Sequence, residues 1–242
     1  MILQINNLVK KFDQVTVLDH INLQVEQGDC FGFLGTNGAG KTTLFRIISN
    51  VLEPTQGTIN IFGKNLSKNS KEIKQRIGYL PDYDLHTMLS GRELLAVTAA
   101  IKGFRLEELL DKINMYCEIL QLSSIDLGKP IKHYSHGMKK KLYMMNALLY
   151  NPELLILDEP FSGLDAQSTF ALRELVNELC QSNRITVFMT EHRLDIAEFL
   201  CNRIAILNKG KIVFNSNPDE IKTANRDLYS SFINVVKRSD ER

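Results

Sequence analysis

The opening part of the chain carries apolar residues at the spacing of β-strands. Within the first 25 residues they recur with short polar breaks between them, and further apolar runs follow at residues 30–34 and 57–63. Alternation with a period of two is typical of half-buried strands, so we expect this part to be rich in β-structure. The positions that carry the first pattern are Ile2, Leu3, Ile5, Val15, Val17, Ile21, Leu23 and Val25.

The hydrophobic period changes to that of helices between about residues 91 and 150. Apolar residues recur at i, i+3, i+4 and i+7 in three segments, at residues 94–101, 106–120 and 136–149. This spacing places them on one face of a helix. The sequence therefore predicts a block of helices in the middle of the chain.

Strands and helices alternate after this block. Residues 154–157 and 185–189 are continuous apolar runs, and residues 170–180 between them have helical spacing. Continuous apolar runs are typical of parallel strands that are buried on both faces. These segments therefore predict an α/β core.

A hairpin and a helical tail are expected near the end of the chain. Two strand-like runs, residues 203–207 and 211–214, flank Asn208-Lys209-Gly210. An Asn or Asp close to a Gly between two apolar runs is a hairpin signal. Residues 218–237 are expected to be mainly helical.

Charge excludes one class of partner. The 242 residues have a net charge of +1 and a hydrophobic content of 44%, which is typical of an ordinary globular protein. A broad nucleic-acid surface needs a basic excess, so no nucleic-acid partner is expected. The basic run Lys139-Lys140-Lys141 is interpreted as a solvent-exposed helix face.

Cysteine spacing and hydropathy exclude other classes. The four cysteines lie far apart in the sequence, so we expect small core residues without zinc or disulfide roles. The N-terminal residues lack the pattern of a signal peptide. The longest apolar candidate, residues 94–101, is too short for a membrane span of about 20 residues. Another chain would have to supply any such span.

A phosphate-binding loop follows the strand predicted at residues 30–34, and an apolar helical run follows the loop. The loop matches the pattern G-x-x-x-x-G-K-[ST], called Walker A. Its glycines allow a tight turn whose amides surround an anion. Lys41 would reach the phosphates, and the Thr42 hydroxyl would bind Mg²⁺. The expected nucleotide-binding residues of the loop are Gly35, Thr36, Asn37, Gly38, Ala39, Gly40, Lys41, Thr42 and Thr43.

Two carboxylates follow the apolar run at residues 154–157. Asp158 would hold Mg²⁺ or its hydration shell beside Thr42, because ligands of such folds bind at the carboxyl ends of strands. Glu159 would polarise an attacking water as a general base. On its own, the pair is equally well explained by a surface turn. The preceding Walker A loop favours the catalytic interpretation.

Ser135 is predicted to cap the third helix of the middle block. Serine is a favoured N-cap, and the free amides at a helix start attract phosphate. A capped helix without a ligand would explain this feature if it stood alone.

The order of these motifs resembles the nucleotide-binding subunit of an ABC transporter, and the resemblance covers essentially the whole chain. Residues 134–138 lie where the family has its LSGGQ signature. The chain departs from that signature at Tyr134, His136 and Met138. By the resemblance, Ser135 and Gly137 approach the γ-phosphate from the opposite subunit.

The resemblance assigns four further residues. Asp165, in residues 162–165, matches the D-loop, and His192 matches the switch histidine that contacts the γ-phosphate. Phe12 falls where an aromatic ring stacks on adenine, although a core aromatic is the alternative. Asp82 stands where the family usually has a glutamine that binds Mg²⁺ or holds the attacking water. An aspartate could still meet Mg²⁺ through water, but its negative charge could slow turnover.

The resemblance implies a single ABC ATPase domain at residues 1–242. Its fold class is α/β: a P-loop NTPase core with a mainly parallel sheet, an N-terminal antiparallel β subdomain and an inserted helical subdomain. Residues 1–82 and 151–242 would form the core with the β subdomain, and residues 83–150 the helical insertion.

The implied function is ATP hydrolysis that powers a transporter, more of the export than the import type. ATP and Mg²⁺ would be the cofactors, with Lys41, Glu159 and His192 as catalytic residues. Partners would be permease subunits on separate chains and a second copy or homologous ATPase subunit, at the cytoplasmic face of the plasma membrane. Permease docking is expected through residues 83–104. The alternatives are an ABC-type ATPase without a transport role and a small-molecule kinase, which shares only Walker A.

Overall fold

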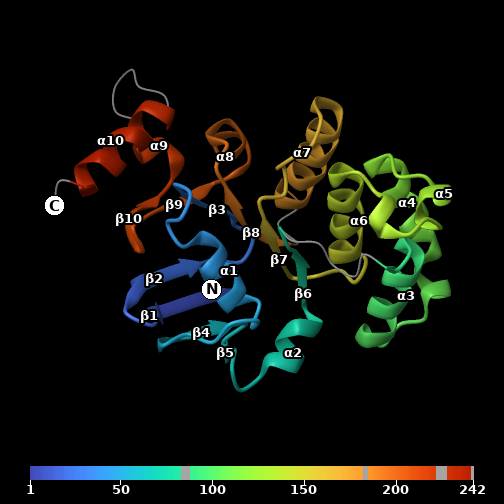
Figure 1. Cartoon of the computed structure of the whole chain (residues 1–242), viewed down its shortest axis with the longest axis horizontal. Coiled ribbons are helices and arrows are strands. Elements are labelled where there is room, and N and C mark those ends of the chain that lie inside the picture. The colour runs from blue at the N-terminus through green and yellow to red at the C-terminus, as the bar shows by residue number, and fades with distance from the viewer. Residues whose placement is uncertain (83–87, 182–184, 222–227, 241–242) are drawn as a thin grey trace.

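The protein folds around two β-sheets, shown in a computed structural model that describes residues 1–82, 88–181, 185–221 and 228–240 (Figure 1). The larger sheet has six strands in the order β10-β9-β3-β8-β7-β6. All neighbouring strands in it are parallel except β10 and β9, which form an antiparallel hairpin. Its strands are β3 (Cys30–Gly35), β6 (Ile77–Leu80), β7 (Leu154–Asp158), β8 (Thr186–Glu191), β9 (Arg203–Asn208) and β10 (Lys211–Ser216).

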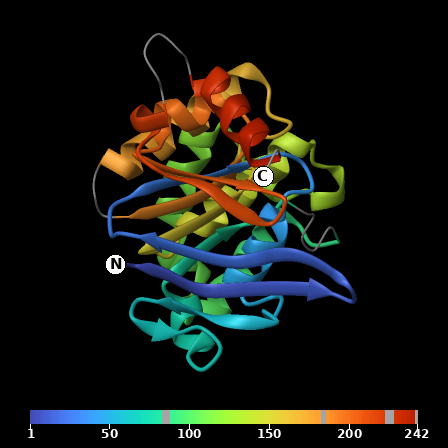
Figure 2. The ribbon, with the colours of Figure 1, turned by 90° about the vertical axis from the view of Figure 1, so that its left-hand side faces the viewer.

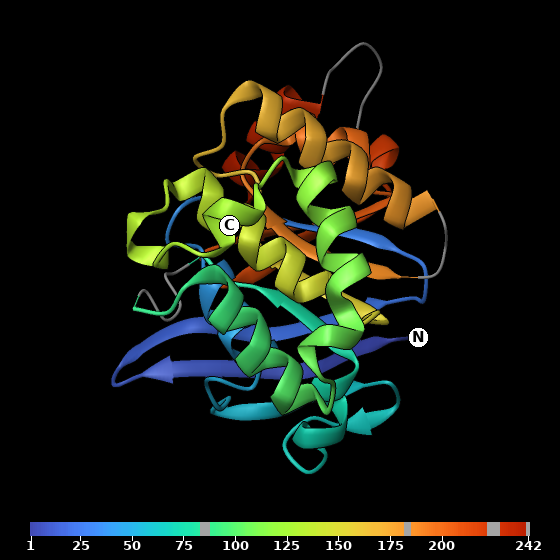
Figure 3. The same cartoon turned by 90° about the vertical axis from the view of Figure 1, so that its right-hand side faces the viewer.

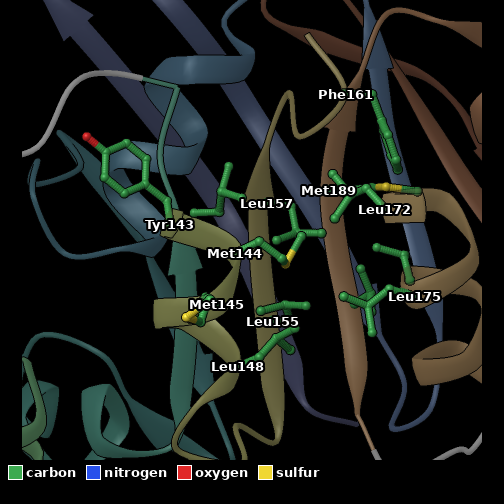
Figure 4. Packing of buried hydrophobic residues seen from close by; sticks show 14 of the residues in the cluster. Tyr143, Met144, Met145, Leu148, Leu155, Leu157, Phe161, Leu172, Leu175 and Met189 are labelled. Carbon is green, nitrogen blue, oxygen red and sulfur yellow. The ribbon is translucent and has the colours of Figure 1, made fainter. Parts of the chain in front are cut away.

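The central strands of this sheet are buried throughout. Every residue of β3, β7 and β8 is buried, which explains their continuous apolar runs, because other elements cover both faces of the sheet. Figure 4 shows how α6 (His136–Leu148) and α7 (Ala166–Gln181) pack against the sheet through Met144, Leu148, Leu172 and Leu175.

The smaller sheet is antiparallel. It lies on the side of the larger sheet that faces away from α6 and α7. Its order is β2-β1-β4-β5, with β1 (Leu3–Phe12), β2 (Val15–Val25), β4 (Gln56–Ile61) and β5 (Lys64–Asn65). Figure 2 shows the two long strands β1 and β2 side by side. Helix α1 (Lys41–Ile48) packs between the two sheets through a second apolar cluster that includes Phe45 and Phe188, whose rings stack at 5.1 Å.

The middle of the chain is helical and lies at the right-hand end of the molecule in Figure 1, and Figure 3 shows these helices nearest the viewer. The N-terminus of α3 is fixed by a capping box between Ser90 and Glu93, and the helix ends at Gly103 in the left-handed region. The elements of this part are α3 (Gly91–Lys102), η1 (Leu106–Leu109), α4 (Leu110–Leu120), α5 (Ser124–Leu127), η2 (Ile131–His133) and α6.

The remaining helices cover the core. They are α2 (Ser70–Gln75), α7, α8 (Leu194–Leu200), α9 (Pro218–Ile221) and α10 (Leu228–Asp240). Within the described part of the chain, no helix is both long enough and apolar enough to cross a bilayer.

The predicted fold class is confirmed, and the differences are local. The strand predicted at residues 57–63 ends at Ile61, because Phe62 and Gly63 turn with positive φ into β5. The helix predicted at 170–180 begins earlier, at Ala166. The sequence analysis missed β6, α2 and α8, which are short. The expected tail helix is present as α9 and α10, with residues 222–227 outside the described part, and the division at residues 83 and 150 stays a prediction.

Candidate active site

The phosphate loop connects the carboxyl end of β3 to α1. Gly38 and Gly40 have φ of 79° and 112°, in the left-handed region that favours glycine. A Cβ at Gly40 would also lie 2.9 Å from the carbonyl oxygen of Val17. The N-terminus of α1 has no side-chain cap and no acidic residue in its first turn. Its amides and the positive end of its dipole therefore face the loop, an arrangement that fits a phosphate group.

Lys41 bends back over this loop. Its buried ammonium donates hydrogen bonds to the carbonyl oxygens of Gly35, at 2.8 Å, and Thr36, at 3.3 Å. Burial lowers the pKa of Lys41, whereas the nearby carboxylates of Glu159, Asp158 and Glu191 act in the opposite direction. The lysine is thus a cation held at the loop by weak acceptors that a phosphate could replace.

Asp158 ends strand β7 next to strand β8. It pairs with Thr190 in the parallel register, and its Oδ1 accepts a hydrogen bond of 2.7 Å from the Thr190 hydroxyl. Burial raises the pKa of Asp158, and the bond from Thr190 acts against that shift. This buried carboxylate and the exposed Thr42 hydroxyl supply hard oxygen donors, which suit Mg²⁺.

Glu159 has a left-handed backbone with a φ of 45°. For a residue other than glycine this costs about 1–3 kcal/mol unless its surroundings fix it. Its N–H donates to Thr190 Oγ1 at 2.9 Å, and its carbonyl oxygen accepts from Lys140 Nζ at 2.9 Å. The peptide is thereby held on both sides, and the carboxylate Oε2 lies 3.6 Å from His192 Nδ1.

His192 lies between two carboxylates. Its Nδ1 is 3.5 Å from Oε1 of Glu191, which also accepts hydrogen bonds of 2.9 Å from the amides of His192 and Arg193. Glu191 is 0% exposed, and its Oε2 has no hydrogen-bond partner among the described residues. Burial raises the pKa of Glu191. The sequence analysis missed this residue, although Glu191 ends β8 as Asp158 ends β7, and a carboxylate after an apolar run was the signal that identified Asp158.

The interpretation of Lys139-Lys140-Lys141 as a solvent-exposed helix face is wrong for Lys140. Its side chain is 3% exposed and lies 2.9 Å from Asp82 Oδ1. Lys140 lies on the buried face of α6, whose N-cap is Ser135. Asp82 follows β6 by two residues, so it reaches the same edge of the sheet as Asp158.

The signature residues gather around the turn at residues 163–165. Ser135 caps α6 as predicted, since its hydroxyl accepts from the Met138 amide at 3.2 Å. A Cβ at Gly137 would lie 3.5 Å from Leu164, and one at Gly163 would lie 2.3 Å from the His136 ring. These contacts join the start of α6 to the turn that precedes α7.

Asp165 belongs to this turn and caps α7. Its carboxylate accepts hydrogen bonds of 2.8 Å from the backbone amide of Ser168 and 2.9 Å from the Ser168 hydroxyl. The hydrogen bond from the backbone amide lowers the pKa of Asp165. Asp165 is therefore engaged within its own chain.

Phe12 lies near the end of β1 and is 46% exposed, so the alternative of a core aromatic is wrong. The ammonium of Lys10 lies 4.8 Å from its ring centroid. The exposed ring leaves a π face for stacking.

Two groups of predicted residues therefore emerge. The loop residues 35–43 lie at one edge of the sheet with Asp82, Asp158, Glu159 and His192. Ser135 and Gly137 lie at the start of α6, which contacts the turn at residues 163–165 that contains Asp165. Among the described residues, no group of three or more His, Cys, Asp or Glu could hold a metal ion. A Mg²⁺ ion held by one or two protein oxygens and by phosphates needs no such cage.

A glycine loop at a helix start, with strand-end carboxylates beside its lysine, defines a P-loop nucleoside triphosphatase. A protein-family model described as "ABC transporter" matches residues 18–162. The chain belongs to this family. It is the ATP-binding and ATP-hydrolysing subunit of an ABC transporter, and its partners are the other transporter subunits.

Similar proteins span nearly the whole chain. The bacitracin transport ATP-binding protein BcrA of Bacillus licheniformis is 38% identical, and the match covers 93% of this chain and 72% of that protein. The Nod factor export ATP-binding protein I of Cupriavidus metallidurans is 31% identical over 91% of this chain and 72% of that protein. A solved ATP-binding subunit of an ABC transporter is 28% identical, with a TM-score of 0.89 over 97% of this chain and 99% of that one.

The buried Glu191 generates a prediction on stability. Because its pKa is raised in the native state, the stability that its protonated form contributes is present below the unfolded pKa and lost as pH rises through the folded pKa. Glu191→Gln keeps an acceptor for the two amides and carries no charge. We expect it to melt at a higher temperature than the wild type at about pH 8 and to lose that advantage near pH 4.

Thermal unfolding at several pH values tests this expectation. Glu118→Gln, at an exposed position of α4, is the control and should show no such trend. A Glu191→Gln variant that melts below the wild type at pH 8 would contradict it.

Proposed function

We propose that this chain hydrolyses ATP at a site shared by two ATP-binding subunits and thereby drives export. One observation carries the proposal: each chain holds the phosphate loop, Asp158 and Glu159 at one place and Ser135, Gly137 and Asp165 at another. In a head-to-tail pair, the second group of one subunit would complete the first group of the other.

The site residues fit a nucleotide with Mg²⁺. The amides of residues 35–43 and Lys41 would hold the phosphates, and Phe12 would stack on the base. Thr42 and Asp158 would hold Mg²⁺, with Asp82 able to join through water. The bound ion would neutralise charge on the phosphates.

Glu159 is the proposed general base. Its partly buried carboxylate faces His192 across 3.6 Å and has a fixed peptide behind it, so it would accept a proton from water held between the two side chains. His192 would donate a hydrogen bond to the γ-phosphate. Lys41 would exchange its two carbonyl acceptors for phosphate oxygens.

A hollow between the core and the helical part is proposed to receive the permease. Its volume is about 310 Å³, and its walls come from the end of α1, from β6, α3 and α6, with Val51, Tyr79, Thr98 and Tyr150 among them. The apolar side chain of Val51 in this wall is exposed, and so is that of Ile101 on α3, which is adjacent in sequence to the lining residue Lys102. A cytoplasmic helix or loop of a permease would bury them, which would keep the chain at the cytoplasmic face of the plasma membrane.

The docking region expected at residues 83–104 needs refinement. Tyr83 and Leu85 lie outside the described residues. Met88 is exposed, whereas Leu89 is packed against the core. The proposed surface therefore combines α3 with Val51, which the sequence analysis did not consider.

Export is the favoured direction of transport, because one relative is named Nod factor export ATP-binding protein I. The alternative of an ABC-type ATPase without a transport role is not supported, because the matching family model and this chain's relatives are those of ABC transporters.

Two substitutions test the site. Lys41→Ala removes the cation at the phosphates and should abolish ATP binding or hydrolysis. Glu159→Gln should keep ATP binding, lose about 10²–10⁴-fold in hydrolysis rate, and accumulate as an ATP-bound dimer. Phosphate release and gel filtration with ATP measure these effects.

Glu107→Gln, at an exposed position of η1, is the matched control and should behave as the wild type. A normal rate for Glu159→Gln would exclude it as the base.

The docking proposal predicts a separate loss. Val51→Asp places a charge on an apolar side chain that is 62% exposed, so the chain should fold and hydrolyse ATP normally. Recovery of membrane subunits with the tagged chain, identified by mass spectrometry of a detergent extract, should fall sharply. Ile125→Asp, at a residue that is 74% exposed on α5, is the control. Equal recovery with both variants would reject the docking surface.

A further inference from the structure

Lys140 is a buried cation that touches three parts of the hydrolysis site. Its ammonium lies 2.9 Å from Asp82 Oδ1, 2.9 Å from the carbonyl oxygen of Glu159 and 3.3 Å from that of Asp158. An ammonium has three N–H donors, and these three acceptors can use all of them. The side chain is 3% exposed, so water does not compete for these bonds.

The pair with Asp82 balances charge at this edge of the sheet. A buried ammonium without a counter-charge is costly, and Asp82 supplies that charge. In turn, Asp82 would otherwise add a third carboxylate beside Asp158 and Glu159. The negative charge of Asp82 raises the pKa of Asp158, and the positive charge of Lys140 lowers it. Lys140 thereby offsets the negative charge that Asp82 brings to this edge of the sheet.

The bond to Glu159 acts on its backbone. A φ of 45° is strained for glutamate, and two contacts fix it: the Thr190 hydroxyl at the N–H and Lys140 at the carbonyl oxygen. The direction of the Glu159 side chain toward His192 follows from this backbone. Loss of the Lys140 bond would free the peptide to turn.

We propose that Lys140 is a positioning residue for ATP hydrolysis: it neutralises Asp82 and holds the Glu159 peptide in the orientation that a general base requires. The inference rests on the proposed role of Glu159. Lys140 also lies five residues after Ser135 on α6, a separation of about 7.5 Å along a helix. Helix α6 therefore links two sites. At its start, Ser135 would contact the nucleotide of the second subunit, and five residues later Lys140 holds Glu159, the proposed base of its own subunit.

Steady-state hydrolysis by the purified full-length chain tests this role, with ATP affinity measured separately. Lys140→Met should lower kcat about 10²-fold, because a misplaced catalytic group costs about that much. ATP affinity should stay within about threefold, because the three acceptors that Lys140 contacts lie outside the phosphate loop. Lys132→Met, at an exposed residue of η2, is the control and should retain full activity.

A double substitution separates charge balance from packing. Asp82→Asn leaves Lys140 without its counter-charge, so this variant should also lose kcat. Asp82→Asn with Lys140→Met removes both charges and should be more active than the product of the two single losses predicts. If Lys140→Met does not fold, Asp82→Asn is compared with Asp82→Asn/Lys140→Gln. In this double variant the unpaired charge is gone, and the side-chain amide can still donate to the carbonyl oxygen of Glu159, so kcat should rise above that of Asp82→Asn.

A normal kcat for folded Lys140→Met would overturn the inference. So would a kcat of Asp82→Asn/Lys140→Met that equals the product of the two single losses. If Lys140→Met does not fold, a kcat of Asp82→Asn/Lys140→Gln no higher than that of Asp82→Asn would overturn it. Glu159→Gln distinguishes this failure from that of the proposed function. If Glu159→Gln is inactive while Lys140→Met is normal, only the role of Lys140 fails. If Glu159→Gln is normal, the proposed base itself is wrong.

Discussion

Parallel alignment of β6, β7, β8 and β3 is the constraint on which the site depends. Parallel strands end at the same edge of a sheet. The residues at or just after the ends of these four strands therefore lie along one edge: Asp82, Asp158, Glu191 and the phosphate loop. Strands β3, β7 and β8 are buried at every residue, so their order and register are set by the core rather than by the polar residues. The chemistry of the site is thus positioned by apolar packing that takes no part in it.

Much of this arrangement could be predicted because its signals are local. Continuous apolar runs indicate buried strands, and a carboxylate at the end of such a run lies at the ligand-binding edge whatever the rest of the fold does. The hairpin at residues 208–210 is confirmed by positive φ at Lys209 and Gly210, which its turn requires. The N-cap role of Ser135 depends only on its neighbours, and it is confirmed as well.

The residues that sequence reasoning missed depend on contacts between distant segments. Lys140 looked like part of a solvated run because its counter-charge is 58 positions away, beyond any helical period. The Thr190 hydroxyl links Asp158 and Glu159 only because β8 pairs with β7. Short elements such as β6 and α2 carry too few residues for a hydrophobic period to emerge.

The contact between His136 and Gly163 imposes a rule on sequence variation. The imidazole occupies the space that any Cβ at position 163 would need. A relative that keeps glycine at position 136 has room there, but one with a large side chain at 136 is restricted to glycine at 163. The signature of α6 and the turn before α7 should therefore diverge as a correlated pair. Natural replacement of this histidine would be the first step by which glycine at 163 becomes dispensable, provided the positive φ of 71° is also relieved.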